Sequence, residues 1–264
     1  MKPGRVFFSA WAIAVILFMY VPILVVALFS FNSANFGSVW RGFTLQWYGS
    51  LLSNEKVLSC LSNSMLLAVT STAISTVVGS LLGLALARFT FKLKPAVELL
   101  MFVPVIVPDV VLAIGLVSFY ALIRSFTGLL DLGFGAMLLG HVTFQIPFIA
   151  IVVRARALKI GRFVEEAAVD LGATPFQALR YVILPLTAPG VVAGALLGFT
   201  LSLDDFVVSF FTSGPGSMTL PVFIYSSVKR GITPEINAVS TIMLVFSILL
   251  TLTSLRFQRG TDKS

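Results

Sequence analysis

The chain has 264 residues, a mean hydropathy of +1.01 and only 11% charged residues, so it holds more apolar surface than a soluble domain of this length could bury. This composition excludes a soluble globular protein and indicates an integral membrane protein that lies in a lipid bilayer. The net charge of +7 is spread over many short polar stretches, whereas a nucleic-acid surface would gather basic residues on one folded face. We therefore expect no nucleic-acid partner.

Apolar stretches long enough to cross a bilayer, which takes roughly 20 residues, recur along the whole chain. In chain order they are residues 7–31, 64–87, 96–123, 134–153, 187–211 and 235–255. We predict an all-α polytopic membrane protein with six transmembrane helices in one domain, residues 1–264. The first stretch follows Lys2 and Arg5 as a signal peptide would, but it exceeds the roughly 7–15 apolar residues of a cleavable segment. We expect it to be retained.

Basic residues predict which side of the membrane each loop faces, because Lys and Arg accumulate in cytoplasmic loops. With the N-terminus inside, 13 of the 18 basic residues fall in inner segments and 5 in outer segments. The inner set is Lys2, Arg5, Arg88, Lys92, Lys94, Arg154, Arg156, Lys159, Arg162, Arg180, Arg256, Arg259 and Lys263, and the outer set is Arg41, Lys56, Arg124, Lys229 and Arg230. We predict that both termini are cytoplasmic (N-in/C-in).

Three acidic residues lie within predicted membrane helices: Asp109, directly after Pro108, and the adjacent Asp204 and Asp205. An acid at mid-helix costs about 2.5–3.5 kcal/mol on insertion scales, so each needs a partner or a function. Contact with a translocated cation is one interpretation, and a hydrogen bond between helices without substrate contact is the other. We take all three as candidates for a translocation path, near which Pro104 and Pro108 would loosen the third helix.

Helical spacing separates the two neighbouring acids. At 100° per residue, Asp205 falls about 20° from Gly194 and Gly198, on a face where small residues let helices approach closely. Asp204 is a quarter-turn or more away from that face. We therefore expect Asp205 to be a packing or hydrogen-bonded acid and Asp204 to be the better candidate for a cation path. Gly79 and Gly83 predict a similar close contact for the second helix.

The sequence offers no catalytic set, no metal-binding set and no cofactor motif. Its single histidine, His141, and its single cysteine, Cys60, lie on different segments and supply neither a nucleophile with a base nor a ligand cluster. We expect His141 to be a hydrogen-bond partner between helices, with a proton relay as the alternative. Gly135 and Gly140 are followed by His141, where a phosphate-binding loop needs Lys, so energy must come from a partner.

Between Arg154 and Pro185 lies a loop that is too polar to enter lipid and yet keeps helical signals. A first helix is predicted from Phe163 to Leu171, closed by Gly172 in a left-handed conformation. Residues 174–177, Thr-Pro-Phe-Gln, predict a capping box with proline at the first helical position. We expect the second helix to end near Pro185.

This loop resembles the EAA loop of the membrane subunits of ABC importers, with Val182 where the family favours Ile. The resemblance implies that the loop, about residues 155–186, fits a cleft in a nucleotide-binding subunit and couples ATP-driven closure to the transmembrane helices. The residues that it assigns to ATPase coupling are Glu165, Glu166, Ala167, Ala168, Gly172, Leu184 and Pro185.

The chain as a whole resembles the membrane subunits of spermidine/putrescine ABC importers. The segments that carry this likeness are residues 30–33, 47–48, 108–109, 141–144, 166–172, 199–205, 213–215 and 234–238. The resemblance implies a type I ABC importer permease fold in the bacterial inner membrane. It also implies two ATPase subunits that bind ATP and Mg, a second and often non-identical permease, and an extracytoplasmic polyamine-binding protein. Residues 213–233 are a candidate docking segment for that protein or a plain interfacial segment.

The sequence is also compatible with two alternative functions. The same loop would serve an importer of ferric iron, thiamine or another small solute, since the polyamine assignment depends on the acid pair and its neighbours. A proton-coupled secondary carrier could use Asp109, Asp204 and His141 as a relay, but it would have no need of the EAA loop.

Overall fold

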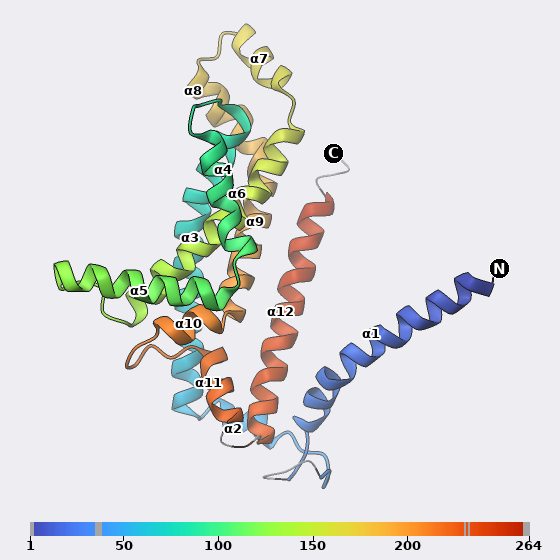
Figure 1. The fold of residues 1–264 in the computed structure, drawn as a ribbon. Coiled ribbons are helices and arrows are strands. Elements are labelled where there is room, and N and C mark those ends of the chain that lie inside the picture. The colour runs from blue at the N-terminus through green and yellow to red at the C-terminus, as the bar shows by residue number, and fades with distance from the viewer. Residues whose placement is uncertain (1–2, 35–38, 230, 232, 261–264) are drawn as a thin grey trace. The chain divides into compact units, whose positions relative to one another are not determined.

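The computed structural model describes residues 3–34, 39–229, 231 and 233–260. Lys2, Arg230 and Lys263, which contribute to the predicted N-in/C-in orientation, lie outside these residues, as does part of the candidate docking segment 213–233. The structure of the described chain is almost entirely helical (Figure 1). The strand-like pairing seen in this part of the chain is an isolated antiparallel bridge between Asn32 and Phe43.

Six helical segments within the described residues are long and apolar enough to cross a membrane, which confirms the predicted number. They are α1 (Pro3–Phe29), α3 (Glu55–Arg88), α5 (Asp109–Thr127), α6 (Phe134–Lys159), the continuous run Pro175–Asp204 that ends with α9 (Leu184–Asp204), and α12 (Pro234–Gly260). Shorter helices are α2 (Gln46–Leu51), α4 (Lys94–Ile106), α7 (Arg162–Asp170), α8 (Pro175–Ala178), α10 (Val207–Thr212) and α11 (Leu220–Val228).

The chain divides into two compact units. The first comprises the described residues within Met1–Ser59 and Phe223–Phe246, and the second those within Cys60–Val222 and Ser247–Ser264. In the first unit, the segment after α1 folds around Asn32, whose side chain donates to the Val39 carbonyl and accepts from the Arg41 amide. The indole of Trp47 donates to the Asn32 carbonyl at 2.8 Å, so the Trp47 side chain is held against this loop.

The predicted third helix, residues 96–123, is wrong as one continuous element. It consists of α4 and α5, separated at Val107 and Pro108, and α5 runs across the direction of α3, α6 and α9 (Figure 1). Val107 is extended, with ψ of 132°, because the ring of a following proline disfavours helical geometry. Pro104, in contrast, stays inside α4.

The predicted fifth helix is also interrupted. α9 ends at Asp204, Asp205 is extended with ψ of 124°, and α10 begins at Val207. The break has a local cause, because the Asp205 carboxylate accepts the amides of Val208 and Ser209 and so competes with continuation of the helix.

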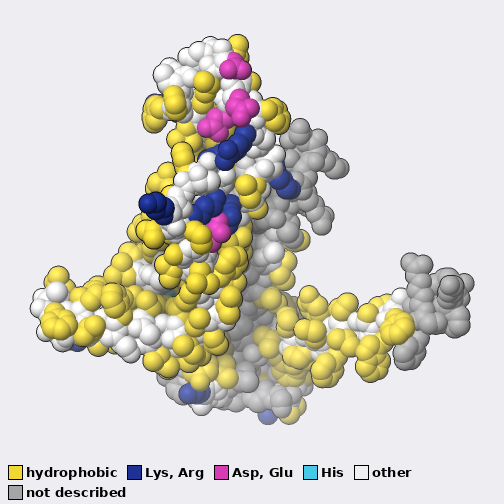
Figure 2. Space-filling model, turned by 45° about the horizontal axis from the view of Figure 1, so that its top comes forward, with side chains coloured by type: hydrophobic (Ala, Val, Ile, Leu, Met, Phe, Trp, Pro, Cys, Tyr) yellow, Lys and Arg dark blue, Asp and Glu magenta, His cyan; other side chains and the backbone are white. Residues whose placement is uncertain are grey.

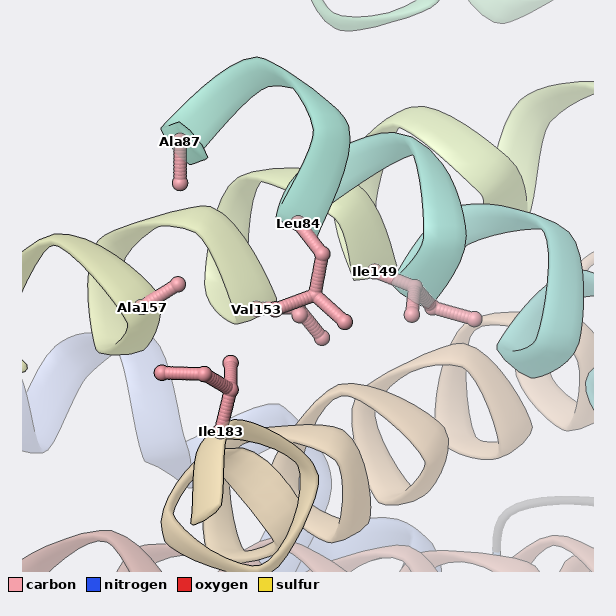
Figure 3. Close-up of a cluster of buried hydrophobic side chains, with 6 residues drawn as sticks. All are labelled: Leu84, Ala87, Ile149, Val153, Ala157 and Ile183. Atoms are coloured by element: carbon pink, nitrogen blue, oxygen red, sulfur yellow. The ribbon is translucent and has the colours of Figure 1, made fainter. Parts of the chain in front are cut away.

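In the second unit, α6 packs between α3 and α9, and both predicted glycine stripes face it. A Cβ on Gly83 of α3 would lie 2.6 Å from the Ala150 carbonyl oxygen, and one on Gly194 of α9 would lie 3.2 Å from Ile149. Such contacts require glycine, which confirms the predicted close approach. The core continues toward α7 as a buried cluster of six side chains (Figure 3): Leu84, Ala87, Ile149, Val153, Ala157 and Ile183.

The polar loop forms an elbow, defined here as residues 162–186. α7 ends at Asp170, and Gly172 follows with φ of +90°, the left-handed closure that the sequence predicts. At Thr174 the capping box is complete: its hydroxyl accepts the Gln177 amide, and the Gln177 side chain accepts the Thr174 amide. The elbow therefore reverses direction over residues 171–174.

The expectation that the second elbow helix ends near Pro185 is wrong. From Pro175 the chain stays helical to Asp204 and passes through a π-helical turn, η1 (Leu179–Ile183), directly before Pro185. A proline removes one amide donor and crowds the carbonyl four residues earlier, and the wider π turn accommodates both effects. Leu184 and Pro185 consequently begin α9.

Candidate functional site

The first candidate site is the elbow, which projects from the end of the second unit at which α6 terminates (Figure 1). No residue of α7 is buried, although the helix carries Phe163 and Val169, both exposed. Leu171, just beyond it, is 90% exposed, and Phe176 on α8 is also exposed. Exposed apolar side chains in a segment this polar are typical of a surface that another protein covers.

The two glutamates of the EAA motif face different surroundings. Glu165 is half-buried and lies toward α3, where its Oε2 is 3.8 Å from Nε of Arg88. Glu166 is exposed, as is Ala167, whereas Ala168 is partly buried. Glu166 is therefore the glutamate that remains available to a partner. The involvement of Arg88 was missed in the sequence analysis, which used this residue only as a topology marker.

Leu184 and Pro185 are exposed at the start of α9, on the same continuous helical run as the capping box. Ile183, directly before them, is buried in the cluster shared with α3 and α6. The elbow is thus joined to the transmembrane core through η1 rather than by a flexible return loop.

The second candidate site is a cavity of about 430 Å³ in the second unit, between α4, α5, α6, α9 and α10. All three predicted acids, Asp109, Asp204 and Asp205, line it, although Asp109 is about 95 positions away from the others in sequence. Among the described residues that line this cavity there is no Lys or Arg. Its other walls include the aromatic rings of Phe144, Phe148 and Phe206.

Asp109 and Asp204 are exposed toward this cavity. Asp109 is the first residue of α5, where a carboxylate is favoured by the helix dipole, and no ion pair to it occurs in the described part of the chain. Asp204 accepts a hydrogen bond from the Ser247 hydroxyl at 2.9 Å. The interruption of the third and fifth predicted helices is what brings these two carboxylates to one cavity.

Asp205 belongs to a buried polar network. Its Oδ2 accepts the Ser209 amide at 2.8 Å and lies 3.3 Å from Nε2 of His141, which is fully buried. The other ring nitrogen of His141 lies 2.7 Å from the Ser202 hydroxyl. His141 is thus a hydrogen-bond partner between helices, and it fixes the junction of α9 and α10.

Comparison with known proteins identifies the family. Residues 75–264 match the family described as binding-protein-dependent transport system inner membrane component. The chain belongs to this family. Among curated members, it is 41% identical to the spermidine/putrescine transport system permease protein PotC of Escherichia coli K12 over 98% of this chain and 97% of that protein. It is 37% identical to the putrescine transport system permease protein PotI of the same organism over 89% and 86%.

Solved ABC transporters share the fold of this chain. The chain superposes on a bacterial alginate ABC transporter, solved with its alginate-bound periplasmic protein, with a TM-score of 0.73, 17% identity and coverage of 100% of this chain and 97% of that one. An inward-facing MetNI methionine ABC transporter gives a TM-score of 0.64 at 23% identity, covering 79% and 99%. The fold is therefore that of an ABC importer permease.

Proposed function

We propose that this chain is the permease subunit of an ABC importer for polyamines and forms half of the translocation pathway. The observation that carries the substrate class is the cavity that presents Asp109 and Asp204 with no basic side chain among its described lining. A di- or trication that leaves water needs carboxylates or carbonyl dipoles in exchange. Full-length similarity to a spermidine/putrescine permease supports the same class.

The aromatic walls of the cavity suit the same substrates. Phe144, Phe148 and Phe206 line the same cavity as the two carboxylates, and an ammonium group gains from the face of an aromatic ring. Methylene segments between the ammonium groups would contact the same rings. Asp205 supports the pathway indirectly, because its carboxylate caps α10 and contacts His141.

Transport is driven from outside the chain. In this proposal, the elbow meets a nucleotide-binding subunit that binds ATP and Mg, with two such subunits in the complex. Glu166, Ala167 and the exposed apolar residues of α7 form the contact, and Gly172, Leu184 and Pro185 shape it. A second, non-identical permease completes the pathway, and an extracytoplasmic binding protein delivers the polyamine. The permease lies in the inner membrane as a single domain.

The elbow lies on the cytoplasmic side, with both chain termini, in this proposal. Support comes from the distribution of charge on the second unit. Arg88 ends α3, Lys94 begins α4, Arg154 lies near the end of α6, and Arg162 begins α7. Such clustering of basic residues at one end of a membrane helix bundle is typical of its cytoplasmic face.

Reconstitution in proteoliposomes tests the proposal. The chain is combined with the predicted ATPase, second permease and binding protein, and ATP-dependent uptake of labelled spermidine and putrescine is measured. We expect uptake that requires ATP and every component. Uptake of ferric iron or thiamine without polyamine uptake would instead support the related importers, and accumulation driven by a proton gradient without the ATPase would support a secondary carrier.

A further inference from the structure

We infer that Arg88 is a positioning residue that transmits movement of the elbow to the transmembrane helices. The inference rests on the proposed function, in which the elbow contacts an ATPase. The proposed function concerns the contact between the ATPase and the elbow, whereas this inference concerns the contact between the elbow and the membrane helices. Arg88 links the elbow to α3 and α6.

Arg88 is the last residue of α3, and its side chain is only 9% exposed. One guanidinium nitrogen, Nη2, donates to the carbonyl of Ile160 at the end of α6, at 3.1 Å. Another, Nε, lies 3.8 Å from Oε2 of Glu165 on α7. In the opposite direction, Nη2 of Arg162 donates to the Arg88 carbonyl at 3.2 Å. One residue therefore joins the ends of α3 and α6 to the start of α7.

These polar contacts matter because α7 has no buried side chain with which to pack against α3. A guanidinium that is nine-tenths buried is costly without a counter-charge, so Arg88 and Glu165 are held together when α7 moves. Ile160, which accepts from Arg88, packs against the buried cluster of Leu84, Ala87, Ile149, Val153, Ala157 and Ile183. A displacement of α7 thus reaches the helices that surround α6.

The distance between Arg88 and Glu165 also has room to change. A cavity of about 350 Å³ lies beside it, lined by Arg88, Arg162, Glu165, Glu166, Val169 and Asp170. Figure 2 shows acidic and basic side chains next to each other at this end of the second unit. At 3.8 Å the Arg88–Glu165 contact is an ion pair without a hydrogen bond, and Nε of Arg88 has no hydrogen-bond acceptor among the described residues. The pair can therefore tighten when an ATPase presses on α7.

The test compares Arg88→Gln, Arg88→Lys and Glu165→Gln in the complete reconstituted complex. It also compares the exchanged pair, Arg88→Glu with Glu165→Arg, with each of these two substitutions made singly. Lys92→Gln is the matched control, since Lys92 is an exposed basic residue in the same connection between α3 and α4. Three quantities are measured for each: the amount of ATPase that co-purifies, the rate of ATP hydrolysis, and the number of polyamine molecules imported per ATP.

We expect Arg88→Gln to keep the ATPase bound and hydrolysing while import per ATP falls about fivefold or more, the lower end of typical coupling between sites. Arg88→Lys keeps the charge but cannot reach both partners, so its loss is intermediate. The exchanged pair restores the ion pair and should transport better than either of its single variants. Lys92→Gln should match the unmodified protein.

An unchanged import-to-ATP ratio in Arg88→Gln would overturn the inference. Loss of the folded subunit in both Arg88→Gln and Arg88→Lys would also overturn it, because the role would then be purely structural. Failure of the unmodified chain to co-purify with an ATPase would reject the proposed function instead, so the two failures are distinguishable.

Discussion

Asp204 and Asp205 are adjacent, yet their carboxylates meet different surroundings. Asp204 is exposed to the acidic cavity, whereas Asp205 is enclosed by His141 and the first turn of α10. In Asp204→Asn we expect polyamine uptake to fall about tenfold with unchanged protein level, since a contact to a charged group is worth ~1.5–3 kcal/mol. Uptake by proteoliposomes that contain equal amounts of each variant is the measurement.

Asp205→Ala should act on stability instead. It removes the acceptor for two α10 amides and leaves His141 without its carboxylate, a loss of ~2 kcal/mol in the free energy of unfolding. Asp205→Asn retains an oxygen that can cap the helix and is the milder control. Thermal unfolding of the detergent-solubilised protein measures the effect. A destabilised Asp204→Asn together with a stable Asp205→Ala would contradict this division of roles.

A third prediction at this scale concerns the space around the Cα atom of Gly83. A Cβ at this position would lie 2.6 Å from the Ala150 carbonyl oxygen, so Gly83→Ala must push α3 away from α6. We expect a loss of ~1–3 kcal/mol, typical of an overpacked contact. Gly115→Ala on α5 is the control, because its Cβ would meet nothing within 4 Å. If both variants unfold at the same temperature, the close α3–α6 packing is not required for stability.

Among the elements, the elbow depends on how α7 ends. Gly172 has φ of +90° and its amide donates to the Val169 carbonyl at 2.8 Å. Space around its Cβ position is open, so backbone conformation alone determines which side chains fit. We expect Gly172→Val to cost ~1–2 kcal/mol and to reduce ATPase co-purification and uptake, while Gly172→Asn retains most of both because Asn tolerates this conformation.

Gly172→Pro is the severe version of this test. Proline can neither adopt the positive φ nor donate the amide hydrogen, so α7 should lose its closure and uptake should be abolished while membrane insertion persists. Insertion is checked by the amount of protein in washed membranes. Normal uptake by Gly172→Pro would refute the proposed role of the elbow in docking.

Local sequence signals were sufficient for several of these elements. The capping box at Thr174, the left-handed Gly172 and the glycine stripe that includes Gly83 each depend on a few neighbouring residues, and each was predicted correctly. The breaks before Asp109 and after Asp204 were not predicted. Pro108 indicated a weak point. The end of α9 depends on the Asp205 carboxylate turning to accept the Val208 and Ser209 amides, and this carboxylate also contacts His141, 64 positions away; neither contact is visible in a pattern of apolar residues.

Hydropathy also could not locate the cavity. Hydropathy predicts apolar segments that are long enough to cross a membrane. It cannot distinguish one continuous helix from two helices separated by a break, because both have the same composition. The three acids were recognised as candidates because acids are costly in lipid. That Asp109 shares a cavity with Asp204 follows from the fold, since α5 turns away from α4 at Pro108. Arg88 was missed for a related reason, because a basic residue at the end of a helix is ordinary in a membrane protein.

At the scale of the whole molecule, the proposed function requires the elbow and the loop after α1 to lie on opposite sides of the membrane. Cysteine labelling tests this in a Cys60→Ala background. Cys60 is the single cysteine of the sequence, so each variant then carries one introduced thiol. Leu171→Cys introduces a thiol at a position that is 90% exposed in the elbow, and Val39→Cys one that is 68% exposed in the loop after α1. Both substitutions place the probe outside the apolar spans.

A membrane-impermeant maleimide should label Leu171→Cys only in inside-out vesicles and Val39→Cys only in right-side-out vesicles. Addition of the ATPase to stripped inside-out vesicles should slow the labelling of Leu171→Cys, because the elbow is then covered, and should leave Val39→Cys unaffected. Labelling of Leu171→Cys from the outer side would reverse the orientation predicted from the basic residues. It would also place the elbow beyond the reach of any cytoplasmic ATPase, so the coupling mechanism would fail together with the topology.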